Sequence, residues 1–177
     1  MSVHSLFSQE KPTLIYIGDP MCSWCYGFSP QISQVKQNLG DSIEFMLVMG
    51  GLRPNGTETM AQLKGFLTHH WEEVAKRSGQ PFAYDVLDSS DWLYDTEPAC
   101  RAVVTFRYFK PEAEFTFFKE VQSAFYEHNQ NPNLAANYAT LAAQHGVDSS
   151  AFHDAFVSDS LKKQTWEDFA LARELQA

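Results

Sequence analysis

Hydrophobic residues in the first third of the chain form two unbroken runs with a helical stripe between them. Residues 13–18 are apolar and β-branched without polar alternation, which predicts a buried strand. Between residues 28 and 39 the apolar positions recur at steps of four, three and four, which predicts an amphipathic helix that is kinked at Pro30 and ends at Gly40. A second apolar run at residues 43–49 predicts another strand. This order predicts a βαβ unit with parallel strands and a right-handed crossover.

The rest of the chain has the pattern of a helical block. Helices are predicted at about residues 57–78, from Pro98 onward, from Pro111 to the Asn131-Pro132 pair, and at about 133–144, 148–157 and 159–175. We interpret the stripe of Phe115, Phe118 and Phe125 as core packing.

The predicted fold class is therefore α/β, with a βαβ unit and a large all-helical insertion. We divide the chain into residues 1–56, which contain the βαβ unit, residues 57–157, which form the helical insertion, and residues 158–177, a helix that returns to the first part.

Composition and charge restrict the partners and the location. With 177 residues and 44% apolar residues, the chain suits one globular domain. A formal net charge of −9 argues against nucleic acid or an anionic membrane as the main partner. No apolar run approaches the roughly 20 residues of a membrane span. The first eleven residues lack a basic start and an apolar stretch, so we expect no signal peptide and a cytoplasmic protein.

Two of the three cysteines, Cys22 and Cys25, have C-x-x-C spacing where the first strand gives way to the helix. Unpaired N–H groups and the helix dipole stabilise a thiolate at such a helix start. We expect Cys22 to be the exposed nucleophile and Cys25 the inward-facing resolving thiol. Either Asp19 or Ser23 could cap this helix, and Trp24 is expected to form an apolar rim beside Cys22.

A metal site is the main rival interpretation of the cysteine pair. Structural zinc needs four ligands, but Cys100 is alone, and the adjacent His69 and His70 point in different directions on a helix. We therefore expect no metal. Cys100 is interpreted as a small buried residue, with a regulatory thiol as the alternative. Residues 50–56 are interpreted as a turn, with Arg53 near the mouth of the active site as the alternative.

The segment from Asp19 to Phe28, Asp-Pro-Met-Cys-Ser-Trp-Cys-Tyr-Gly-Phe, resembles the active-site segment of the DsbA-like branch of the thioredoxin superfamily, closest to the cytoplasmic FrnE-type thiol–disulfide oxidoreductases. Further similar segments lie at residues 50–54, 96–104 and 125–126.

This resemblance implies a thioredoxin fold with a helical insertion, and a protein disulfide reductase or isomerase. Cys22 would be the attacking thiol and Cys25 the resolving thiol, with Asp19, Pro20, Ser23 and Trp24 as their neighbours. The implied partners are protein or small-molecule disulfides and thiols. No cofactor is expected besides the dithiol, with glutathione one candidate reductant.

Two departures from the family pattern change these expectations. No His lies between the cysteines, so the dithiol should be less oxidising than in the strongly oxidising members. In the family, the helix that ends in Ala-Arg-Glu-Leu is followed by a cis-proline loop, two strands and a closing helix, whereas here Leu175 is followed by Gln176 and Ala177. We expect that C-terminal ββα part to be missing.

A two-stranded sheet is marginal on its own, so the expectation is a truncated protein or one that another chain completes. We expect a homodimer or exchanged segments that cover the surface near Phe45, Leu47 and the terminal helix.

Two other functions share this layout. Glutathione-dependent isomerases and kappa-type glutathione transferases have a similar arrangement but generally carry Ser where Cys22 stands. An inactive truncated binding module is the non-enzymatic alternative.

Overall fold

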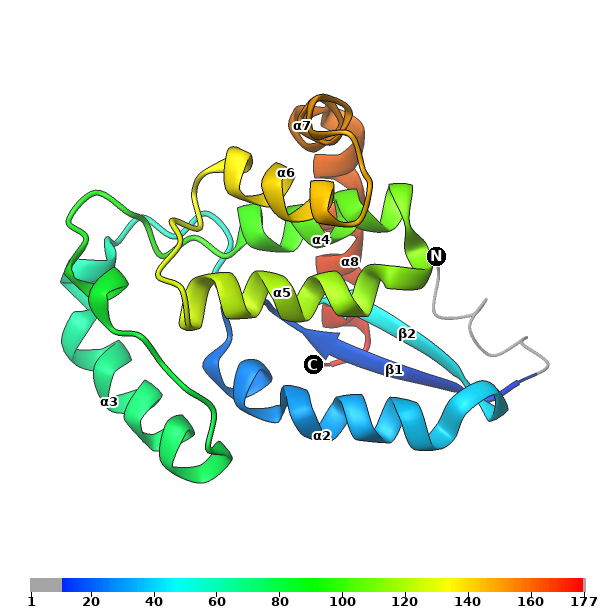
Figure 1. Ribbon diagram of the computed structural model, residues 1–177, viewed down its shortest axis with the longest axis horizontal. Coiled ribbons are helices and arrows are strands. Elements are labelled where there is room, and N and C mark those ends of the chain that lie inside the picture. Colours follow the sequence, from blue (N-terminus) through cyan, green and yellow to red (C-terminus); the bar gives the residue numbers. More distant parts are fainter. Residues whose placement is uncertain (1–10, 177) are drawn as a thin grey trace.

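The computed structural model describes residues 11–176, so the predicted lack of a signal peptide concerns residues outside this range. Strand β1 (Thr13–Gly18) pairs in parallel with β2 (Glu44–Met49), from Thr13 opposite Glu44 to Gly18 opposite Met49. Helix α2 (Ser23–Leu39) connects them (Figure 1). The predicted parallel βαβ unit is confirmed, and within residues 11–176 the sheet has these two strands.

Six further α-helices follow in the described part of the chain: α3 (Met60–Ser78), α4 (Glu97–Phe109), α5 (Glu114–Tyr126), α6 (Ala135–Gln144), α7 (Ser149–Val157) and α8 (Asp159–Glu174). Short 3₁₀ helices occur at Gly40–Ser42, Asp85–Asp88 and Pro111–Ala113. The predicted helix near residue 57 begins later, because Thr59 and Gln62 form a capping box. None of the helices between residues 11 and 176 is both long and apolar enough to cross a membrane.

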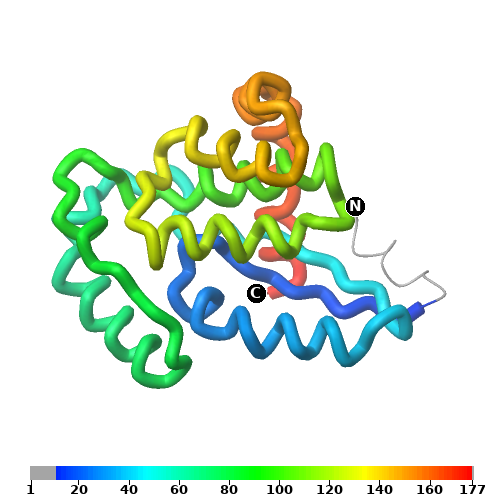
Figure 2. The backbone as a smooth tube through the Cα atoms, in the orientation of Figure 1, coloured from blue at the N-terminus to red at the C-terminus, as the bar shows by residue number. Residues whose placement is uncertain are grey.

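Each face of the sheet is covered by helices. The rings of Tyr16 and Phe45 face α5, where the ring of Phe115 lies 5.1 Å from that of Phe45. On the opposite face, Val48 packs with Leu171 and Ala172 of α8, which crosses behind the strands (Figure 2).

This packing corrects the expectation of an uncovered apolar surface for Leu47, whereas Phe45 is half-buried and lines a groove along the edge of β2. Leu47 is only 4% exposed, because residues of the helical block pack on it within the same chain. The sequence pattern could not show this cover, because α5 is far from the strands along the chain.

Side chains bond to two backbone groups on the outer edge of β2. The carbonyl of Leu47 accepts a hydrogen bond from Arg107 (3.0 Å), and the amide of Met49 donates one to Asp168 (2.9 Å). Arg107 and Asp168 are themselves paired (2.9 Å). Helices α4 and α8 are therefore fixed against the edge of the strand that lies away from β1.

Helix α2 continues through Pro30. Proline lacks the N–H that would bond the carbonyl four residues earlier, which belongs to Tyr26. The side-chain amide of Gln80 donates to that carbonyl instead (3.3 Å). A side chain at Gly27 would come within 2.6 Å of Val74, so this glycine allows α3 to pack closely on α2.

Candidate active site

A buried turn connects β1 to α2. The amide of Cys22 donates to the carbonyl of Asp19 (3.1 Å), and Pro20 and Met21 between them are buried. Asp19 is 3% exposed, and its carboxylate accepts hydrogen bonds from the amides of Met21 and Leu52, each at 2.8 Å. The turn before the C-x-x-C motif is thus tied to the loop that follows β2.

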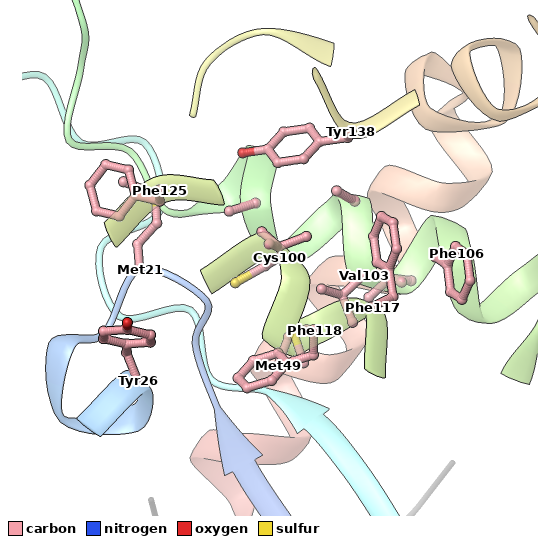
Figure 3. Close-up of a cluster of buried hydrophobic side chains, with 14 of the residues drawn as sticks. Met21, Tyr26, Met49, Cys100, Val103, Phe106, Phe117, Phe118, Phe125 and Tyr138 are labelled. Carbon is pink, nitrogen blue, oxygen red and sulfur yellow. The ribbon is translucent and has the colours of Figure 1, made fainter. Parts of the chain in front are cut away.

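Met21 and Tyr94 anchor this turn from the other side. The Met21 side chain is fully buried among aromatic residues of the helical block (Figure 3). Its carbonyl accepts a hydrogen bond from the hydroxyl of Tyr94 (2.9 Å). The residue that precedes Cys22 is therefore held by both its side chain and its backbone.

Cys22 itself is the N-cap of α2. Its Sγ accepts a hydrogen bond from the amide of Cys25 (3.4 Å). The sequence-based expectation that Asp19 or Ser23 caps the helix is wrong. The Asp19 carboxylate is occupied by the amides of Met21 and Leu52, and Ser23 is the first residue inside the helix.

The thiols of Cys22 and Cys25 are both free, and their pKa values are shifted in opposite directions. Hydrogen bonds from the side chain and the amide of Cys25 lower the pKa of Cys22 to about 7, although burial and the Asp19 carboxylate act against this. The pKa of Cys25 is raised, because its thiol donates a hydrogen bond to the Cys22 sulfur and is removed from solvent. Near pH 7 about half of Cys22 is therefore the thiolate at the helix N-terminus, while Cys25 keeps its proton.

The face of α2 beside the dithiol is aromatic and open to solvent. Trp24 is 46% exposed and Phe28 is 47% exposed. The guanidinium of Arg77 lies 5.6 Å from the centre of the Trp24 ring. Trp24 thus lies at the surface as expected, and it shares a shallow groove with Gly27, Phe28, Gln31, Arg77 and Ser78.

Cys100 lies in α4 and is fully buried. This burial agrees with the interpretation of Cys100 as a small buried residue. The thiol also makes a polar contact, because it donates a hydrogen bond to the Asp19 carboxylate (3.3 Å). The Asp19–Leu52, Asp19–Cys100 and Tyr94–Met21 contacts were not predicted from the sequence. Each joins residues that are 33 or more positions apart, for which a single sequence gives no signal.

Between residues 11 and 176, no three His, Cys, Asp or Glu side chains gather closely enough to hold a metal ion. Arg53 pairs with Glu58 and lies over the ring of Tyr94. It is therefore near the turn that carries Cys22, though its charge is already partnered.

A dithiol at the start of a helix, on a βαβ unit with a helical block, defines the class of thioredoxin-like proteins with a DsbA-like insertion. Residues 15–177 match the family described as Thioredoxin. The chain therefore belongs to the thioredoxin family, with a thioredoxin-like fold of the DsbA-like branch. A sequence search of curated proteins gives no match.

Solved structures agree with this assignment. A candidate protein disulfide isomerase from Nitrosomonas europaea is 35% identical, with a TM-score of 0.85 over 94% of this chain and 80% of that one. The cytosolic disulfide reductase DsbM from Pseudomonas aeruginosa is 25% identical, with a TM-score of 0.80 over 93% and 78% of the two chains, and it has also been solved with glutathione (GSH). A 2-hydroxychromene-2-carboxylate isomerase is 16% identical, with a TM-score of 0.63 over 93% and 81%, and shares the fold alone.

Proposed function

We propose that this protein is a thiol–disulfide oxidoreductase of the protein disulfide reductase or isomerase type, with Cys22 as attacking thiol and Cys25 as resolving thiol. The observation that carries the proposal is the Cys22 sulfur at the N-cap of α2, where its pKa is about 7 while that of Cys25 is raised. A thiol attacks a disulfide only as the thiolate, so the two sulfurs are suited to successive steps.

The reaction has two displacements. The Cys22 thiolate attacks one sulfur of a substrate disulfide, and the other substrate sulfur leaves with the electron pair and takes up a proton. Cys25 then loses its proton and attacks the Cys22 sulfur, which breaks the mixed disulfide and releases the second substrate thiol. The protein is oxidised to the Cys22–Cys25 disulfide and the substrate disulfide is reduced to two thiols.

The substrates we propose are protein or small-molecule disulfides, with glutathione as the reductant that restores the dithiol in a cytoplasmic setting. Two observations support this. The dipeptide Ser23-Trp24 has no His to stabilise the thiolate further, which favours a reducing dithiol. DsbM, at 25% identity, is a cytosolic disulfide reductase and has been solved with glutathione.

Insulin reduction in the presence of glutathione tests this function. Wild type should reduce insulin, Cys22→Ser should have no activity, and Cys25→Ser should accumulate mixed disulfides that mass spectrometry detects. Cys100→Ser is the matched control, because it removes a thiol outside the C-x-x-C motif and keeps an O–H donor toward Asp19. Near-normal turnover by Cys22→Ser would contradict the dithiol mechanism.

The glutathione-dependent isomerases and transferases are the alternative enzymes on this fold. They generally use a Ser at the position of Cys22 and have no task for a second thiol, so the presence of both cysteines favours the oxidoreductase. A glutathione-conjugation assay on the same preparation distinguishes the two, and a protein inactive in both assays would be a binding module.

A further inference from the structure

The hydroxyl of Tyr16 is a buried polar group that the mechanism above does not use. Its oxygen is inaccessible to solvent and makes no hydrogen bond of ordinary geometry with any group in residues 11–176. Buried hydroxyl groups are normally paired, so an unpaired one needs an explanation. Four aromatic rings hold the Tyr16 ring in place, at centroid distances between 6.1 and 6.5 Å: Phe28, Phe45, Phe115 and Phe118.

The hydroxyl-bearing end of the Tyr16 ring lies beside Gly18, close to the turn that leads into α2, because a Cβ at residue 18 would lie 3.4 Å from Tyr16 Cζ. Cys25, in the first turn of α2, is the thiol whose proximity acts on the pKa of this phenol. Tyr16 projects from β1 onto the face that α2 covers, and its ring contacts Phe28, one turn after Cys25. Gly18 leaves room for the ring, because a Cβ at residue 18 would lie 3.1 Å from Tyr16 Cε1. Burial and the neighbouring Cys25 raise the pKa of Tyr16, so the phenol keeps its proton and can only donate it in a hydrogen bond.

We propose that the Tyr16 hydroxyl donates a hydrogen bond to the Cys25 sulfur when that sulfur becomes a thiolate in the resolving step. The proposal rests on the proposed function of the dithiol and adds a residue from β1 to it.

The chemistry explains why a donor is needed at this point. Before the reaction, the Cys25 thiol donates a hydrogen bond to the Cys22 thiolate, and this hydrogen bond raises the pKa of Cys25. Once Cys22 is part of a mixed disulfide, that partner is neutral, and Cys25 must lose its proton in a buried place. A hydrogen bond from Tyr16 stabilises the resulting thiolate without proton transfer from the phenol. The Cys25 sulfur then bonds to Cys22 Sγ, and the substrate sulfur leaves with the electron pair and takes up a proton in place of the one that Cys25 lost.

A single-turnover reaction with the chromogenic disulfide DTNB separates the two steps. Attack by Cys22 releases one coloured thionitrobenzoate, and attack by Cys25 releases the second. In Tyr16→Phe, the first release should keep its wild-type rate, and the second should slow by about 10- to 100-fold, the range of a hydrogen bond to a charged group. Tyr16→Phe removes one oxygen that has no other partner, and circular dichroism verifies its fold.

Thr105→Val is the matched control. The Thr105 hydroxyl, in α4, is also buried and unpaired within the described residues, and valine has nearly the same shape as threonine. Both releases should keep their wild-type rates in this variant. Equal slowing in Thr105→Val, or a second release in Tyr16→Phe within about twofold of wild type, overturns the proposal. If wild type shows no first release, the proposed function fails instead.

The pH profile of the second release gives a readout that a merely structural role would not move. The titratable groups that face Cys25 are Cys22 and Asp19 from its own turn, Tyr16 from β1, Tyr94 from the segment before α4, and Tyr126 from α5. The Tyr16→Phe variant removes the Tyr16 hydroxyl and leaves Tyr94 and Tyr126 unchanged. The profile should move to higher pH in that variant, and an unshifted profile would contradict the role of Tyr16. Substitution of 3-fluorotyrosine at position 16, which restores the hydroxyl, should return the wild-type profile.

Discussion

The thiol of Cys100 in α4 donates a hydrogen bond to the carboxylate of Asp19, at 3.3 Å and across 81 residues of sequence. The same carboxylate accepts the amides of Met21 and Leu52. One buried carboxylate therefore joins the turn before Cys22 to the loop after β2 and to the helical block. Burial raises the pKa of this carboxyl, and in its charged form Asp19 raises the pKa of the nearby Cys22 thiol.

The first prediction follows from that charge. Asp19 raises the pKa of Cys22, so Asp19→Asn should lower it below about 7. Alkylation of Cys22 at a series of pH values, followed by mass spectrometry, measures the midpoint. Asp95→Asn is the matched control, because Asp95 also accepts two amides but does not act on Cys22. An Asp19→Asn midpoint above that of wild type would show that its hydrogen bonds, and not its charge, dominate.

The second prediction concerns the pH dependence of thiol reactivity in the reduced protein. A pKa of about 7 for Cys22 means that its thiolate is lost as pH falls below 7 and is nearly complete above pH of about 8. Iodoacetamide should label Cys22 with a midpoint near pH 7. Cys25 has a raised pKa and Cys100 is fully buried, so both should remain unlabelled until the protein is denatured. Preferential labelling of Cys25 would reverse the assigned roles.

The third prediction tests the ion pair that bonds to the edge of β2. Arg107→Ala removes the guanidinium that pairs with Asp168 and Glu114 and bonds to the Leu47 carbonyl, in a half-buried place where Asp168 keeps only the Met49 amide. Removal of one partner from such a pair costs about 3–5 kcal/mol of unfolding free energy, which urea denaturation measures.

The control for this prediction is Arg77→Ala. Arg77 pairs with Glu73 on an exposed helix face, so its loss should cost less than about 1 kcal/mol. Similar costs for the two substitutions would mean that the Arg107 pair does not fix the helices to the strand.

The sequence pattern correctly predicted those features of the fold that depend on residues within a single helix or strand. The β1 run, the helical stripe of α2 and the end of that helix at Gly40 all follow from residues within one element. The prediction of the N-cap was wrong, because it depended on where the Asp19 carboxylate points. The hydrogen-bond partners of that carboxylate come from distant segments of the chain. The cover over Leu47 was missed for the same reason. Spacing predicted the dithiol, but the groups that surround it, Tyr16 and Tyr94 among them, depend on tertiary packing.

The last prediction concerns Gly51, in the loop that Asp19 holds through Leu52. Gly51 has a φ of +64°, and a Cβ there would lie 2.7 Å from the ring of Phe169 in α8. Gly79 offers a matched control, because its φ is +75° but nothing lies within 4 Å of the Cβ position. The backbone conformation alone costs a non-glycine residue roughly 1–2 kcal/mol, so Gly79→Ala should lose about that much unfolding free energy. Gly51→Ala should lose about 1–3 kcal/mol more, since the Phe169 ring must also move. Urea denaturation of both variants measures the difference, and equal losses would show that α8 does not pack tightly on this loop.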